Sequence, residues 1–190
     1  MDETATKQLG VLREIDEILA GLRVRYWLRG GWAVDFLLGR VTRSHSDLDL
    51  VVWQRHRGRM QRALEDAGFS LDRELLVQND LVKDGQDITF VFLERSADGS
   101  VSAHGMPDWR WRSDALPLRR HCFDGICARV VAPQQMLQDF HGYEAATGRP
   151  LRPKDAGTME TLRAIITLDG QEPELPHDRE TTTGVGQPAR

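Results

Sequence analysis

The hydrophobic pattern of the first two thirds of the chain predicts alternating helices and strands. Apolar residues recur every three or four positions over residues 7–22, which predicts an amphipathic helix, and Gly21 favours a stop near its end. Short helices are expected over residues 32–38 and 57–67, and Gly39 is suited to close the first of them. Short apolar runs predict strands over residues 24–28, 48–53, 69–77, 88–93 and 126–131.

The pattern changes after Pro133, a residue type that fits the first position of a helix. Helices are predicted over residues 134–146 and 154–168, whereas residues 96–118 show no regular period. We therefore expect an α+β fold in which a mixed β-sheet is flanked by helices. The expected parts are a core domain over residues 1–132, a small helical subdomain over residues 133–169 and a polar, disordered tail over residues 170–190.

Composition narrows the class of protein. The chain has 190 residues, of which 40% are hydrophobic and 28% charged, which is typical of a globular domain able to bury a core. No apolar run is long enough to cross a membrane, and the polar N-terminus does not read as a secretory signal. Cys122 and Cys127 do not make a disulfide framework, so they are read as small, buried or partly buried residues in a reduced, cytoplasmic protein.

The charge balance argues against a dedicated nucleic-acid binder. The formal net charge is −4, and most of it falls in the last 22 residues, so the body of the chain is close to neutral. Proteins that bind nucleic acid usually carry a basic excess, because neutralising phosphates drives their affinity. A small neutral or cationic partner fits this chain better than a polyanion.

Two carboxylates mark the start of one predicted strand. Asp47 and Asp49 are two positions apart, so in a strand both side chains face the same way. Neighbouring carboxylates repel each other unless a cation lies between them, and hard oxygen ligands suit Mg²⁺. A pair of this kind standing alone is more often a solvent-facing strand start, so its surroundings decide the interpretation.

Two features of the surroundings favour chemistry. Gly30 and Gly31 follow a predicted strand and open a predicted helix, where backbone N–H groups can approach a phosphate; a simple tight turn is the alternative. Asp87 begins the strongly apolar segment DITFVFLE. If that strand lies beside the one carrying Asp49, Asp87 completes a three-carboxylate site, and Asp84 is the rival for this role.

The pattern GGWAVDxxxGRxTRxHxDLDL over residues 30–50 resembles the DNA polymerase β-like nucleotidyltransferase superfamily. It is most similar to the branch containing aminoglycoside and lincosamide nucleotidyltransferases, which act in antibiotic resistance. The likeness extends more loosely through Asp87, the segment DFHGYE (139–144) and the segment RPKD (152–155). It implies a nucleotidyltransferase core for the predicted α+β fold.

The resemblance also implies roles for individual residues. Residues expected to contact the nucleotide are Gly30, Gly31, Arg40, His45 and Lys154, and His45 has the alternative role of orienting Asp47. Residues expected to hold two Mg²⁺ ions and to act in catalysis are Asp47, Asp49 and Asp87. Asp139 aligns with a general base, with Glu144 as the alternative, whereas Arg43 is read as plain surface loop.

The expected reaction moves a nucleoside monophosphate from an NTP, with ATP the first choice, to a hydroxyl of a small acceptor such as an aminoglycoside. Acidic and aromatic residues that could line an acceptor pocket occur between residues 94 and 114, but arginines are interleaved with them, so a lincosamide or another hydroxylated acceptor stays open. Trp109 and Trp111 there are pocket, core or lid residues. Two further alternatives are modification of a protein or RNA, as in antitoxin-like enzymes and suggested by the basic run over residues 55–62, and a non-catalytic binding module.

Overall fold

The computed structural model describes the backbone of residues 2–147 and 150–169, and the side chains within these stretches except those of residues 142–147, 153–154 and 169. The helices are α1 (Glu3–Gly21), α2 (Gly30–Leu38), α3 (Arg57–Asp66), α4 (Pro133–Thr147) and α5 (Pro153–Asp169), with a 3₁₀ turn η1 (Gln54–His56) before α3. The strands are β1 (Tyr26–Arg29), β2 (Asp47–Trp53), β3 (Ser70–Glu74), β4 (Gln78–Lys83), β5 (Gln86–Arg95), β6 (Val101–Ala103), β7 (Met106–Trp111), β8 (Arg120–Phe123) and β9 (Ile126–Val130).

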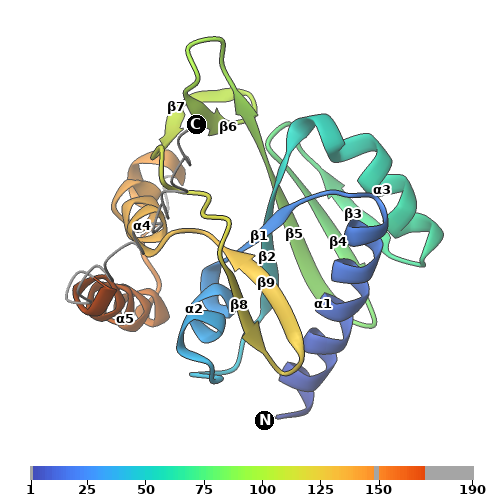
Figure 1. Cartoon of the computed structure of the whole chain (residues 1–190), viewed down its shortest axis with the longest axis horizontal. Coiled ribbons are helices and arrows are strands. Elements are labelled where there is room, and N and C mark those ends of the chain that lie inside the picture. Colours follow the sequence, from blue (N-terminus) through green and yellow to red (C-terminus); the bar gives the residue numbers. More distant parts are fainter. Residues whose placement is uncertain (1, 148–149, 170–190) are drawn as a thin grey trace, which may run out of the picture.

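In the described part of the chain the strands form one mixed sheet with the order β3-β4-β5-β2-β1-β9-β8, and β6 and β7 extend it from β5. At its centre β2 runs antiparallel to β1 and parallel to β5, while β1 runs parallel to β9. Figure 1 shows α1 and α3 on one side of the sheet and α2, α4 and α5 on the other. The expected α+β class, with a mixed sheet flanked by helices, is confirmed.

The central strands are buried because their apolar side chains meet helices on both faces. Leu48 and Leu50 of β2 are fully buried, as are Ile15 of α1 and Leu64 of α3. Trp32 of α2 is also buried. The apolar alternation that predicted β2 therefore reflects a strand packed between two layers of helix.

Each helix predicted from the sequence is present. The helix over residues 32–38 is α2, and it ends where expected because Gly39 adopts the left-handed conformation (φ 65°) that closes a helix. The helix over residues 57–67 is α3, which ends at Asp66. Among the helices of the described residues, none is both long and apolar enough to cross a membrane.

The strand predicted over residues 69–77 is shorter, and β4, which follows it, has no counterpart in the prediction. β4 begins with alternating half-buried and buried positions, but one of its buried residues is the polar Asn79. Arg57 and Gln61 of α3 satisfy its side chain with hydrogen bonds of 2.5 and 3.0 Å. A buried asparagine breaks the apolar period, which is why sequence reasoning missed the strand.

The region over residues 96–118, expected to be irregular, contains the hairpin of β6 and β7. The pattern hides it because β6 is only three residues long and most of β7 is exposed. Trp111 at the end of β7 is a core residue, whereas Trp109 is partly buried.

The expectation for the cysteines was wrong. Cys122 of the unpredicted strand β8 lies directly opposite Cys127 of β9, and a disulfide joins them. Cys127 is partly buried as expected, but Cys122 is exposed. Spacing alone did not reveal the pair, because it depends on the register of a hairpin whose first strand is an exposed edge.

The predicted division into a core domain over residues 1–132, a helical subdomain over 133–169 and a tail over 170–190 stays a prediction. The helices α4 and α5 pack against each other, and α5 also packs against α2 of the expected core. The predicted disordered tail over residues 170–190 lies outside the described residues.

The buried face of β2 gives a first test. Replacing Leu50 with alanine should lower the free energy of unfolding by about 2–5 kcal/mol, because it leaves a cavity between the sheet and its helices. Leu118→Ala is the matched control: its side chain is 64% exposed, and it should change the unfolding free energy by less than about 0.5 kcal/mol. Equal losses in urea denaturation would contradict the packing described.

Candidate active site beside the diglycine turn

The parallel pairing of β2 and β5 brings the predicted carboxylates to one edge of the sheet. Asp47 lies directly opposite Asp87, and Asp49 lies opposite Thr89. Residues opposite each other point to the same face of a sheet, so Asp47, Asp49 and Asp87 share a face. Asp47 and Asp49 are half-buried, whereas Asp87 is exposed. The backbone arrangement expected for a three-carboxylate site is present.

Gly30, at the junction of β1 and α2, packs against the carboxyl group of Asp49. Gly30 has a positive φ of 68°, and a Cβ atom placed on it would overlap Asp49 Oδ2. Only glycine satisfies both the backbone conformation and the close approach. The first glycine of the pair therefore fixes the position of one candidate metal ligand.

The second glycine stands beside the loop that leads into β2. A Cβ atom on Gly31 would overlap the imidazole of His45 and would come 2.8 Å from Arg43 Nη2. With no side chains at Gly30 and Gly31, the side chains of Asp49, His45 and Arg43 pack closely against the backbone at the start of α2. A helix N-terminus offers unpaired N–H groups and a positive dipole, which together suit an anion.

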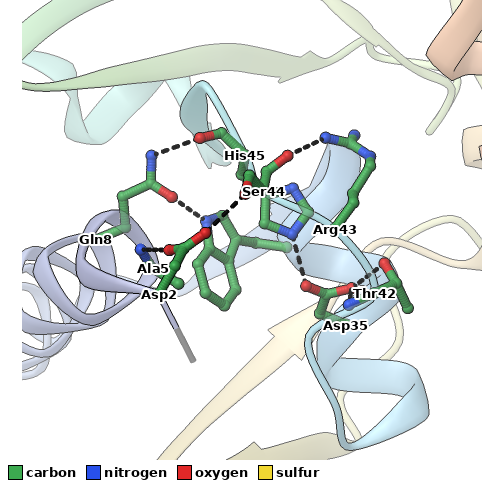
Figure 2. Close-up of polar contacts among 9 residues, drawn as sticks. Asp2, Ala5, Gln8, Asp35, Thr42, Arg43, Ser44 and His45 are labelled. Atoms are coloured by element: carbon green, nitrogen blue, oxygen red, sulfur yellow. Dashed lines mark hydrogen bonds and ion pairs between the residues drawn. The ribbon is translucent and has the colours of Figure 1, made fainter.

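A buried carboxylate in α2 holds this loop in place. Asp35 is fully buried, and its Oδ1 accepts hydrogen bonds from the backbone N–H of Thr42 (3.1 Å) and from the Thr42 hydroxyl (2.6 Å). Its Oδ2 is joined to Nε2 of the buried His45 at 2.5 Å, as Figure 2 shows. The loop between α2 and β2 is thus bonded back to the helix just before Asp47.

The same network reaches α1. The Gln8 side chain donates to the backbone carbonyl of His45 (3.2 Å) and accepts from Trp32 Nε1 (2.9 Å). The rings of Trp32 and His45 pack with their centroids 4.7 Å apart. His45, expected to contact phosphate, has its Nε2 committed to Asp35, so its position favours a role in holding the loop.

Two hollows flank the diglycine turn. The first encloses about 230 Å³, and its lining includes Gly31, Arg43 and Thr161. The second encloses about 210 Å³ and contains both Asp47 and Asp49. Residues that line the second hollow are Arg29, Gly30, Asp47, Asp49, Met136, Asp139, Phe140, Arg152, Thr158 and Leu162.

The basic residues predicted at the nucleotide fall in different places. Arg43, read from sequence as plain surface loop, lines the first hollow beside Gly31. Arg40 is exposed just after the C-terminal end of α2, the opposite end from the diglycine turn. The side chains of Lys154 and of Glu144, the alternative base, lie outside the described residues.

Asp139 of α4 lines the second hollow but is already engaged. Its Oδ1 accepts hydrogen bonds from Gln135 Nε2 (2.9 Å) and Trp109 Nε1 (3.2 Å). Its Oδ2 lies 3.2 Å from Arg29 Nη2 in an ion pair, and the carboxylate side chain is only 7% exposed. To act as a general base, Asp139 would first have to break its ion pair with Arg29.

The acids considered for an acceptor pocket have partners elsewhere. Glu94 pairs with His104 at 2.6 Å, which lowers the pKa of the carboxyl group. Asp114 pairs with Arg112 at 2.8 Å, and its pKa is likewise lowered by the guanidinium. Neither acid lines the hollow that contains Asp47 and Asp49.

The carboxylates at this site have the chemistry that a divalent metal requires, but they are not gathered into a closed cage. Among the described residues no three His, Cys, Asp or Glu side chains are gathered as a preformed metal cage. The donor set is nevertheless of the right chemistry, because Asp47, Asp49 and Asp87 offer only hard carboxylate oxygens on one face. The absence of a side chain at Gly30 also lets the carboxyl group of Asp49 pack directly against the backbone there.

Three residues at the site escaped sequence reasoning. Asp35 is the only acid in the apolar helix segment GGWAVDFLL, a signal that could have marked it as a buried partner. Gln8 gave no such signal, because a polar residue in an amphipathic helix reads as solvent-facing. Arg29 precedes the diglycine turn, but its pairing with Asp139 joins segments 110 positions apart.

Comparison with solved structures identifies the class of fold as that of a nucleotidyltransferase. The aminoglycoside enzyme ANT(2'')-Ia, solved in complex with adenylyl-2''-tobramycin, aligns with a TM-score of 0.72 and 19% identity over 86% of this chain and 92% of that one. The lincosamide antibiotic adenylyltransferase LnuA, solved with lincomycin bound, aligns with a TM-score of 0.66 and 22% identity over 81% of this chain and 95% of that one. The nucleotidyltransferase fold expected from the motif is confirmed.

Sequence comparison then gives the family: the chain belongs to the aminoglycoside-2''-adenylyltransferase family, which matches residues 11–155. A 2''-aminoglycoside nucleotidyltransferase of Klebsiella pneumoniae is 42% identical over 64 residues, 32% of this chain and 36% of that protein. A lincosamide resistance protein of Staphylococcus haemolyticus is 36% identical over 56 residues, 30% of this chain and 35% of that protein. The chain thus spans about a third of the length of these curated relatives.

The contact between Gly30 and Asp49 gives a prediction for which Gly39 provides the control. Gly30→Ala and Gly39→Ala both place a side chain at a positive φ, which costs roughly 1–2 kcal/mol. Only at Gly30 must the new methyl group also displace Asp49, since nothing lies within 4 Å of a Cβ on Gly39. Chemical denaturation should therefore show the larger loss for Gly30→Ala, and equal losses would contradict the close packing.

The buried pair gives a second prediction. His45→Ala should lower the free energy of unfolding by about 3–5 kcal/mol, because it leaves Asp35 buried without its imidazole partner. The control is His104→Ala, which removes a similarly short pair with Glu94 from a more exposed position and should cost less than about 1 kcal/mol. Thermal or urea unfolding of both variants measures the difference, and similar losses would count against the role of the pair.

Proposed function

We propose that this protein is a Mg²⁺-dependent nucleotidyltransferase that moves a nucleoside monophosphate, with ATP as the expected donor, to a hydroxyl of a small antibiotic-like acceptor. The observation that carries the proposal is the register of β2 and β5, which sets Asp47 opposite Asp87 on the face that also carries Asp49, next to the diglycine turn. Family membership and the shared fold support it.

In this proposal Asp47, Asp49 and Asp87 hold the divalent ions. Bound Mg²⁺ supplies charge stabilisation for the attacking hydroxyl and for the leaving pyrophosphate. The contribution of the chain is to keep the three carboxylates on one face. The Gly30 contact fixes Asp49, and the Asp35–His45 link fixes the loop before Asp47.

The N-terminus of α2 is the proposed contact for the triphosphate. N–H groups at a helix N-terminus stabilise phosphate oxygens through hydrogen bonds and the helix dipole. Arg43, which lines the hollow beside Gly31, can add a positive charge there. Lys154 keeps its predicted role at the triphosphate from the family resemblance alone.

The acceptor is proposed to enter the second hollow, where Met136, Phe140 and Leu162 provide an apolar wall close to Asp47 and Asp49. A hydroxyl oriented there attacks the α-phosphorus in line, the bond to pyrophosphate breaks, and the hydroxyl proton leaves to a base or to water. Asp139 stays the predicted base, on the condition that its bond to Arg29 opens.

Two acceptor classes follow from the relatives. ANT(2'')-Ia was solved with an adenylylated aminoglycoside, tobramycin, and LnuA with a lincosamide, lincomycin. Protein or RNA modification stays an alternative, because Arg55, Arg59 and Arg62 of the basic run are exposed. Arg57 of the same run is only 12% exposed and bonds Glu74. Tobramycin and lincomycin are the two probes of choice for a small acceptor.

The direct test is to incubate the protein with ATP or GTP, Mg²⁺ and each probe, and to look for the nucleotidylated product by mass spectrometry. We expect a mass increase of one nucleoside monophosphate on at least one probe, and its loss when EDTA removes the metal. Failure of any nucleotide to bind in the presence of Mg²⁺, measured by calorimetry, would exclude the proposed reaction.

The carboxylates themselves give a matched pair of variants. Asp49→Asn and Asp87→Asn should each reduce turnover by at least about a hundredfold while the thermal midpoint stays close to that of the wild type, since both side chains serve the ions rather than the core. Asp84→Asn is the control, because Asp84 lies in the turn before β5 at a positive φ of 50° that asparagine tolerates. If Asp84→Asn were the inactive variant and Asp87→Asn the active one, the assignment of the third carboxylate would be wrong.

A further inference from the structure

The second hollow is lined by both acidic and basic side chains, whereas a site that binds a polycation is expected to be mainly acidic. Three carboxylates line it, those of Asp47, Asp49 and Asp139, together with the guanidinium groups of Arg29 and Arg152. In the proposed function, on which this inference rests, Asp47 and Asp49 are taken up by metal ions. Among the described residues that line the hollow, Asp139 is then the one carboxylate left to attract an amine of the acceptor.

Asp139 is not available for that task, because Arg29 already neutralises it. Arg29 Nη2 lies 3.2 Å from Asp139 Oδ2, and the two side chains are only 21% and 7% exposed. Gln135 and Trp109 bond the other carboxylate oxygen. Because the two opposite charges lie close together, their electric fields largely cancel at the position of a third charge.

The arginine is held in this position from two sides. Its backbone ends β1, where Arg29 lies directly opposite Asp49 on β2. Its guanidinium stands over the ring of Trp109, 5.4 Å from the ring centroid, in a cation–π contact. Trp109 in turn donates to Asp139, so the three side chains form one closed set.

The other arginine of the hollow is likewise paired with a carboxylate, and it brings no free negative charge to the lining. Arg152 bonds Asp155, which is 3% exposed, through Nε and Nη2 at 3.1 Å each. Its carboxylate partner lies outside the lining of the hollow, whereas the guanidinium belongs to it. The rest of the wall is apolar, through Met136, Phe140 and Leu162.

We propose that Arg29 is a specificity-determining residue, which cancels the charge of Asp139 and so selects a hydroxylated acceptor with an apolar face and at most one positive charge. Among the described residues of this lining, a polycationic aminosugar meets no carboxylate without a paired cation once Asp47 and Asp49 hold metal ions. A singly charged acceptor needs fewer such carboxylates and gains contact with the apolar wall. By this inference the protein prefers a lincosamide-like acceptor to an aminoglycoside, although the family is named for the latter.

The test compares the dissociation constants of tobramycin and lincomycin by calorimetry, with Mg²⁺ present and no nucleotide, in wild type and four variants. The variants are Arg29→Leu, Arg29→Lys, Asp139→Asn and the double variant Arg29→Leu/Asp139→Asn. Any attraction by Asp47 and Asp49 is common to all five proteins, so it cancels when the ratio of the two constants is compared between variants. Thermal unfolding accompanies each titration, and the double variant keeps the test valid if Arg29→Leu alone folds poorly.

We expect the wild type to bind lincomycin more tightly than tobramycin. Arg29→Leu frees the carboxylate of Asp139 and should raise the affinity for tobramycin about tenfold relative to lincomycin. Arg29→Lys keeps the charge and should keep the wild-type ratio. In the double variant the gain should vanish, because the freed carboxylate is gone, and Asp139→Asn alone should weaken tobramycin binding further.

Three outcomes would overturn the inference. They are an unchanged affinity ratio in Arg29→Leu, a gain in tobramycin affinity that persists in the double variant, and no binding of either probe to any of the five proteins. A fall in ATP affinity in Arg29→Leu with an unchanged acceptor ratio would assign Arg29 to the nucleotide instead. Because binding is measured without turnover, these results are separate from the transfer assay, whose failure would count against the proposed reaction and not against Arg29.

Discussion

The close contact between Gly30 and the carboxyl group of Asp49 is the constraint on which the site depends. A side chain at Gly30 would overlap Asp49 Oδ2, so β1, α2 and β2 can meet in this way only with glycine at that position. The contact brings a helix N-terminus, which favours anions, next to carboxylates, which favour cations. That juxtaposition suits a substrate made of a polyphosphate and its metal ions.

The buried polar network behind the turn holds the loop that leads into β2. Asp35 and His45 are bonded to each other inside the protein, and Gln8 ties the same loop to α1. Buried polar groups are costly unless every member has a partner, and here the partners come from three separate segments. The loop before Asp47 is therefore specified by the fold of the whole N-terminal half, and not by the loop sequence alone.

The sequence predicted those parts of the site that depend on short-range spacing. Local geometry predicts the two-residue step from Asp47 to Asp49, the glycines at the start of α2 and the cap at Gly39. The pairing of Asp87 with Asp47 needed only that two apolar strands be neighbours. The pairing of Arg29 with Asp139 and the Cys122–Cys127 disulfide depend on packing and register between segments, which no local pattern encodes. β4 was not predicted because its buried Asn79 is polar and the residues that bond its side chain lie on helix α3.

The central claim is that Asp47, Asp49 and Asp87 bind divalent ions beside the diglycine turn. It is tested most directly by anomalous diffraction from crystals grown with Mn²⁺ and a non-hydrolysable ATP analogue. The prediction is manganese density between these three carboxylates, with the analogue's phosphates against the N-terminus of α2. Manganese bound elsewhere, or an analogue seated away from Gly30 and Gly31, would contradict it.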